Sequence, residues 1–97
     1  MKNLIFEWDS RKANSNYKKH GVTFEEAKTA FFDEQAIVYF DPDHSDDEER
    51  FILLGTSHTL NQVVVCHCFR EEETSIRIIS ARKADKEEAQ AYWENRK

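Results

Sequence analysis

The fold of this chain is indicated first by the stretch Ile76-Arg77-Ile78-Ile79-Ser80-Ala81-Arg82-Lys83-Ala84. β-Branched residues dominate its first half and predict a strand, and a helix signal follows at Asp85. Because side chains alternate along a strand, we expect the even-numbered ones from Ile76 to Arg82 on one side and the odd-numbered ones from Arg77 to Ala81 on the other. Arginine is almost never buried unpaired. Arg77 and Arg82 are therefore either paired or exposed structural residues, or part of a surface that binds anions.

Length and composition favour one small folded domain spanning residues 1–97. The chain is 39% hydrophobic, contains seven Phe, three Tyr and two Trp, and has only two Gly and one Pro. These values are typical of a globule with a modest core. No apolar run is long enough to cross a bilayer and no secretory signal is visible, so we expect a cytoplasmic protein without a membrane partner.

Cys66 and Cys68 lie two residues apart on a predicted strand, where a disulfide would be strained. Free thiols in a reducing compartment fit better. With the intervening His67, the two cysteines form a Cys-His-Cys sequence that could suggest metal ligands. However, the side chain of His67 is expected on the opposite face of the strand, and the sequence contains no second pair of ligands with the spacing of a zinc site. We expect neither a metal nor another cofactor.

The net charge of −5 at first argues against a nucleic-acid partner. Six acidic residues between positions 41 and 49 account for that excess and leave the rest of the chain at a net charge of +1. Basic clusters lie elsewhere, at Arg11-Lys12, Lys18-Lys19-His20 and Arg82-Lys83. Local positive patches of this kind can still bind phosphates. The acidic run lacks the pattern of a calcium loop and is interpreted as a solvated loop.

Two helices are predicted in the first third of the chain. Asp9 is a candidate N-cap for a helix that runs to His20 and stops at Gly21, with Ala13 and Tyr17 marking its inner face. Its basic residues form either a solvated face or an anion site. Thr23-Phe24-Glu25-Glu26 is a capping box that begins a second helix, whose buried stripe we expect to include Phe24, Ala27 and Phe31.

The remaining signals predict strands and a last helix. Strands are expected at 4–8, 36–41, 49–56, 63–70 and 76–82, and Asp85 with Glu88 caps the final helix. The order β-α-α-β-β-β-β-α predicts an α+β domain, with an antiparallel sheet of about four strands, the first strand at an edge, and helices covering one side.

The cationic side chains of the sheet are the candidates for chemistry. Neighbouring antiparallel strands bring Arg50 toward Arg70, whereas Arg82 belongs toward the opposite end, so topology leaves open whether the three arginines converge. His67 could transfer protons near neutral pH, or it could be a core histidine with its hydrogen bonds satisfied. Arginine, histidine and lysine together suit phosphodiester chemistry, and RNA supplies its own 2′-hydroxyl nucleophile.

The sequence resembles a known family over nearly its whole length. The matching features are Phe6, Trp8-Asp9, Lys18-Lys19-His20-Gly21-Val22 with Phe24 and Ala27, Glu49-Arg50-Phe51 before Gly55, Arg77-Ile78-Ile79-Ser80-Ala81-Arg82 with Ala84, and Glu88 with Tyr92. Together these segments resemble the BrnT toxins. The resemblance implies a RelE-like fold, toxicity through RNA cleavage, and neutralisation by a co-encoded BrnA-type antitoxin. It also implies that operator DNA is bound only through the antitoxin.

The resemblance also implies that basic residues on the sheet carry the activity. On this chain it points to Arg50, His67, Arg70 and Arg82 as catalytic residues, and we expect Lys12, Lys19, His20, Arg77 and Lys83 to bind RNA. A small antitoxin is expected to cover the arginines. Since operator-binding antitoxins commonly act as two-fold dimers, one expected form of the complex is a dimer of heterodimers.

A second hypothesis comes from a different class of function. In it, the cationic sheet is a binding module that recognises an acidic protein partner and has no catalysis of its own. The first hypothesis is instead a metal-independent endoribonuclease toxin. Both predict a partner on the same face of the sheet, so only an assay of RNA cleavage separates them.

Overall fold

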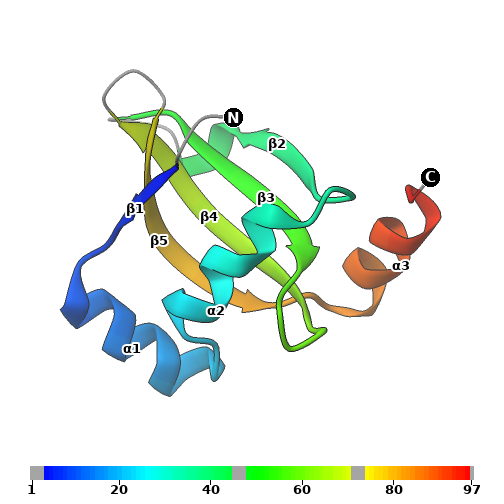
Figure 1. Cartoon of the computed structure of the whole chain (residues 1–97), viewed down its shortest axis with the longest axis horizontal. Coiled ribbons are helices and arrows are strands. Elements are labelled where there is room, and N and C mark those ends of the chain that lie inside the picture. Colours follow the sequence, from blue (N-terminus) through cyan, green and yellow to red (C-terminus); the bar gives the residue numbers. More distant parts are fainter. Residues whose placement is uncertain (1–3, 45–47, 71–73, 97) are drawn as a thin grey trace.

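A computed structural model of the chain describes residues 4–44, 48–70 and 74–96, which form three helices and one sheet (Figure 1). The elements in order are β1 (Ile5–Glu7), α1 (Ser10–His20), α2 (Phe24–Thr29) with a 3₁₀ turn at Ala30–Phe32, β2 (Ile37–Asp41) with a 3₁₀ turn at Pro42–His44, β3 (Arg50–Thr56), β4 (Gln62–Arg70), β5 (Ser75–Lys83) and α3 (Lys86–Glu94). The predicted element order and the α+β class are confirmed.

The sheet has five strands in the order β1-β5-β4-β3-β2. Strands β2 to β5 form the predicted antiparallel meander. Strand β1 lies at the edge and is parallel to β5, with Phe6 opposite Ile76. Since β1 is only three residues long, it covers only the first part of β5 and leaves the rest of that strand's edge to α1.

The helix ends follow the signals in the sequence. The carboxylate of Asp9 accepts hydrogen bonds from the first turn of α1, and Gly21 ends that helix with φ of 72°, a left-handed value that favours glycine. The hydroxyl of Thr23 accepts a hydrogen bond from Glu26 N at 3.0 Å, but the predicted capping box is incomplete because the Glu26 carboxylate accepts from Ser57, Thr59 and Asn61 instead. Asp85 and Glu88 form a complete capping box at α3.

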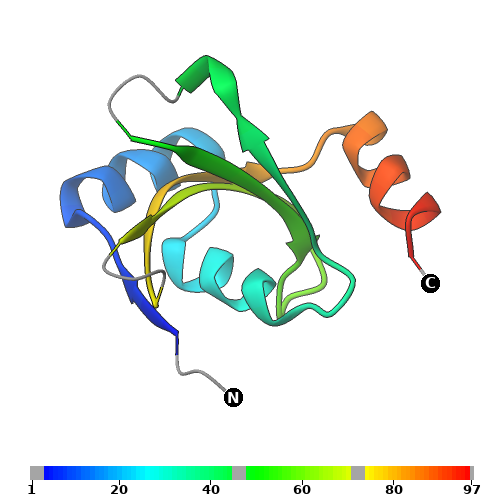
Figure 2. The same cartoon turned by 90° about the horizontal axis from the view of Figure 1, so that it is seen from above.

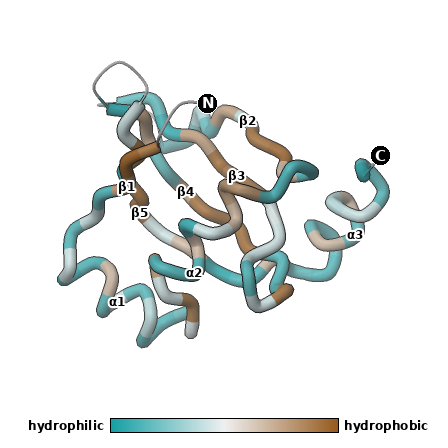
Figure 3. Tube along the Cα trace, in the orientation of Figure 1, coloured by the Kyte–Doolittle hydropathy of each residue, from teal (hydrophilic) through white to brown (hydrophobic). Residues whose placement is uncertain are grey.

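Helix α2 covers one face of the sheet, called here the helix face, whereas α1 lies beside the edge of β5 (Figure 2). Phe24 and Ala27 are buried there and pack with Leu53, Val65 and Ile78. Apolar residues accordingly follow the strands at the centre of the molecule, whereas α1 is polar along most of its length (Figure 3).

Two expectations about the helices are wrong. Tyr17 is 55% exposed, and the inner side of α1 carries the buried Asn16 instead. The helices also do not all cover one side of the sheet. Tyr92 of α3 packs on Leu54 and Val64, whose side chains lie on the opposite face, called here the open face.

A β-bulge in β5 changes the side on which its arginines lie. Cys66 pairs with Ser80 but His67 pairs with Ile78, so Ile79 is an extra residue. Ile78 therefore remains in the core of the helix face, whereas Arg82 joins Arg77 on the open face. The strict alternation of side chains that the sequence predicts for this strand is therefore wrong beyond the bulge.

Candidate active site

The open face contains a cleft of about 380 Å³ between β2 and the C-terminal end of α1. Its lining residues are His20, Asp41, His44, Arg50, Ile52, Val64, Cys66, Ile79, Ser80, Ala81 and Arg82. Ile52, Val64 and Cys66 come from the central strands. The arginines, histidines and Asp41 come from different elements, so the fold gathers polar groups around an apolar centre.

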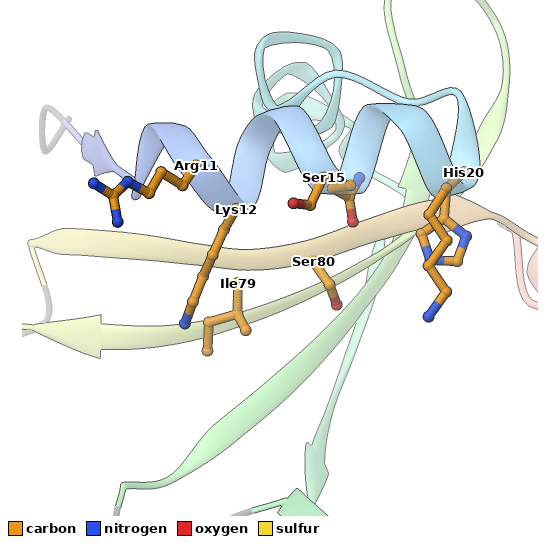
Figure 4. A pocket seen from close by; sticks show the side chains of 8 residues that line it. Arg11, Lys12, Ser15, His20, Ile79 and Ser80 are labelled. Atoms are coloured by element: carbon orange, nitrogen blue, oxygen red, sulfur yellow. The ribbon is translucent and has the colours of Figure 1, made fainter.

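A second recess, of about 320 Å³, lies between α1 and β5 (Figure 4). It is lined by Arg11, Lys12, Ser15, Asn16, Lys19, His20, Ile79 and Ser80. In Figure 4 Lys12 extends from α1 beside Ile79, and His20 lies at the other end of the same helix. Because both recesses share His20, Ile79 and Ser80, one basic surface runs from α1 across β5 to β3.

Asn16 fixes α1 against the edge of β5. Its side-chain Nδ2 donates to the carbonyl oxygen of Ala81 at 2.8 Å, and its Oδ1 accepts from Ala81 N at 3.0 Å. The same Nδ2 also donates to the carbonyl oxygen of Val22 at 3.1 Å. This buried amide thus supplies the hydrogen bonds that a neighbouring strand would supply, and it holds the helix that carries His20 next to Ser80 and Arg82.

Arg82 is held by α3. Its guanidinium donates to both carboxylate oxygens of Glu88, at 2.7 and 2.8 Å. These bonds raise the pKa of Arg82 and hold the pKa of Glu88 below its usual range. A bidentate pair uses only part of the five N–H donors of arginine, so Arg82 is positioned and still has donors for an anion in the cleft.

His44 and Asp41 form a hydrogen bond in the wall of the cleft. Nδ1 of His44 lies 2.9 Å from Oδ2 of Asp41. Both residues belong to the acidic run that the sequence led us to interpret as a solvated loop. The spacing of a carboxylate and an imidazole three residues apart was the only signal for this pair in the sequence.

His67 lies away from this cleft, on the helix face. It is fully buried, with the Phe31 and Phe69 rings at centroid distances of 4.8 and 5.4 Å. Nδ1 lies 3.1 Å from the carbonyl oxygen of Val65, and Nε2 has no hydrogen-bond partner among the described residues. Burial lowers the pKa of His67, because the charged imidazolium is poorly solvated there.

This burial predicts a pH-dependent stability. The pKa of His67 in the folded state lies below its ordinary value of 6.5, so between these two values the unfolded chain binds more protons. The stability linked to His67 is therefore complete above 6.5 and is lost as the pH falls below it, by at most about 1.4 kcal/mol per pH unit. Urea unfolding at pH values from about 5 to 7.5 should show this slope in the wild type and a smaller one in His67→Leu. Equal slopes would contradict it.

The other predicted site residues lie outside the cleft. Arg70 forms an ion-pair contact with Glu7, at 3.7 Å between Nε and Oε1, near the β1 edge. Arg77 lines a separate shallow recess with Glu7, Trp8 and Asp9. Lys83 is exposed at the end of β5. Arg50, Arg82 and His20 therefore line the cleft, Lys12 and Lys19 line the recess that shares His20 with it, and Arg70 and His67 line neither.

The two cysteines are free thiols, as the sequence predicts. Cys66 borders the cleft, and burial raises the pKa of its thiol. Among the described residues, no three His, Cys, Asp or Glu side chains form a group that could hold a metal ion. Every helix in this part of the chain is too short or too polar to span a lipid bilayer.

Comparisons with known proteins agree with this fold. A family model described as "Ribonuclease toxin, BrnT, of type II toxin-antitoxin system" matches residues 8–88. The chain is also similar to the crystal structure of the Brucella abortus ribonuclease toxin BrnT, with 23% sequence identity and a TM-score of 0.63. That similarity covers 89% of this chain and 100% of the Brucella chain, and it supports a common fold. No match was found among curated proteins.

Proposed function

The chain belongs to the family of BrnT ribonuclease toxins of type II toxin–antitoxin systems, and on that premise we propose that it cleaves cytoplasmic RNA in the open-face cleft without a metal ion. The observation that carries this proposal is that Arg50, Arg82 and His20 line one cleft although they come from three different elements. We further propose that residues 1–97 act as a single toxin domain.

The arginines would bind the scissile phosphate. Arg50 and Arg82 supply N–H donors that match phosphate oxygens, and their charge stabilises the additional negative charge of the transition state. Lys12 and Lys19 line the recess next to the cleft, where they would bind phosphates farther along the RNA. We retain Arg77 and Lys83 as proposed outer contacts to RNA, and neither lines the cleft or the adjoining recess.

The reaction is a transfer of the phosphodiester to the neighbouring 2′-hydroxyl. The 2′-oxygen loses its proton and bonds to phosphorus, the bond from phosphorus to the 5′-oxygen breaks, and the 5′-oxygen gains a proton. The products are a 2′,3′-cyclic phosphate and a 5′-hydroxyl. His20 lies at the junction of both recesses and is the imidazole we assign to proton transfer, in place of the buried His67. Arg70 has no role in this proposal because its contact is to Glu7.

We propose a BrnA-type antitoxin as the protein partner. An acidic or phosphate-like segment of the antitoxin would cover Arg50 and Arg82 and exclude RNA, with association accelerated by charge. Operator DNA would be bound through the antitoxin, and a dimer of heterodimers is the assembly expected on a two-fold operator.

Incubation of the purified chain with RNA in excess EDTA tests the proposal. We expect cleavage that leaves cyclic phosphate ends and stops when the antitoxin is added. Loss of cleavage in EDTA that returns with a divalent cation would contradict the metal-free reaction. If the chain binds an acidic partner in a salt-sensitive way but never cleaves RNA, the binding-module hypothesis is supported instead.

A further inference from the structure

His44 and Asp41 are not used in the function proposed above, yet both line the cleft. We infer that His44, oriented by Asp41, is the general base that removes the 2′-proton, and that His20 is the general acid that protonates the 5′-oxygen. This inference rests on the proposed RNA cleavage and assigns separate roles to the two imidazoles of the cleft.

The contact with Asp41 selects the tautomer that a base needs. A carboxylate accepts hydrogen bonds, so the 2.9 Å contact requires a proton on Nδ1 of His44. In the neutral imidazole this arrangement leaves Nε2 as an acceptor. A carboxylate that fixes the tautomer of a histidine in this way is the arrangement that prepares the base of serine proteases.

The two histidines approach the cleft from different sides. His44 follows β2, at one edge of the sheet, whereas His20 ends α1, which packs on β5. Strands β3 and β4 lie between these elements and contribute Ile52, Val64 and Cys66 to the cleft. Transfer to a 2′-hydroxyl places the attacking and leaving oxygens on opposite sides of phosphorus, so a base and an acid on opposite walls match its requirement.

A purely structural role for the pair would be a surface ion pair that closes the turn after β2. The His44 side chain is 67% exposed, and exposed pairs of this kind contribute little to stability. The β2–β3 ladder places Asp41 opposite Arg50, but a turn-closing pair does not account for Arg82 and the second imidazole in the same cleft. The common location of these groups is the observation that favours proton transfer.

The proton balance of the step is complete. Nε2 of His44 takes the proton of the 2′-hydroxyl as the new bond to phosphorus forms. The bond to the 5′-oxygen breaks, and this oxygen receives the proton that His20 carries. After the products leave, exchange with water returns both imidazoles to their starting protonation states.

An RNA substrate with sulfur in place of the bridging 5′-oxygen separates the two roles. A thiolate leaves without protonation much more easily than an alkoxide, because a thiol is far more acidic. On ordinary RNA we expect His44→Gln and His20→Gln each to lower kcat by about 10²- to 10⁴-fold. On the sulfur substrate we expect His20→Gln to recover to within about tenfold of the wild type, because general acid catalysis is no longer required. His44→Gln should remain slow.

His58→Gln is the matched control, because His58 lies on the turn after β3 and contacts Thr29 rather than the cleft. It should cleave both substrates like the wild type. Wild-type activity of His44→Gln on ordinary RNA would overturn the inference, and so would recovery of both variants or neither on the sulfur substrate. If the wild type cleaves no RNA at all, the proposed function itself fails, which is a different result.

Discussion

Arg82→Ala is expected to lower the rate of RNA cleavage by about 10²- to 10³-fold, the usual cost of one lost transition-state donor. Arg82 lies in the cleft and is held by both oxygens of Glu88, so its position is fixed before substrate binds. Such preorganised donors cost little reorganisation during the reaction. The loss should appear mainly in the first-order rate constant of cleavage, measured under single-turnover conditions with saturating excess toxin.

Two further variants make this expectation specific. Arg82→Lys keeps the charge but loses the planar guanidinium, so we expect an intermediate rate. Arg70→Ala removes an arginine that contacts Glu7 outside the cleft and should remain within about threefold of the wild type. Thermal unfolding must show that each variant is folded. Folded Arg82→Ala at the wild-type rate, or an equal loss in Arg70→Ala, would reject the assignment.

The fold could be predicted largely because its signals are local. Asp9, Gly21, Thr23 and the Asp85 capping box each act within a few residues of where they occur, and the structure contains all of them. Burial of a helix face depends on distant partners and was less predictable. Asn16 is an example: its side chain is buried because it forms hydrogen bonds with the backbone of Ala81, which is 65 positions away in the sequence.

The candidate site was predicted only in part, for two physical reasons. Period-two alternation cannot show a bulge, and the extra residue Ile79 decides that Arg82 lies on the open face. Exposure was the second unknown. His67 lies on a clearly predicted strand, but its side chain is on the face that α2 buries, whereas the accessible imidazoles of the cleft are at a helix end and in a turn.

The assignment of proton transfer to His20 and not to His67 predicts a second large effect on the rate of cleavage. His20→Gln should lower kcat by about 10²-fold or more, since a lost proton-transfer group commonly costs this much. His67→Leu should retain most of the wild-type rate at pH 7.5, because His67 is fully buried on the other face of the sheet. Leucine also removes the Nε2 atom that has no hydrogen-bond partner among the described residues, so the core should tolerate it.

The two variants must be compared at a temperature well below both unfolding midpoints, with cleavage rates taken at saturating RNA. A purely structural defect in His20→Gln would reduce the folded fraction and lower the apparent kcat only in proportion to it. A defect in proton transfer instead lowers the rate of protein that is fully folded. If folded His67→Leu lost as much activity as His20→Gln, proton transfer would have to involve a group that is inaccessible to RNA in this structure. The cleft would then have to rearrange before it could act.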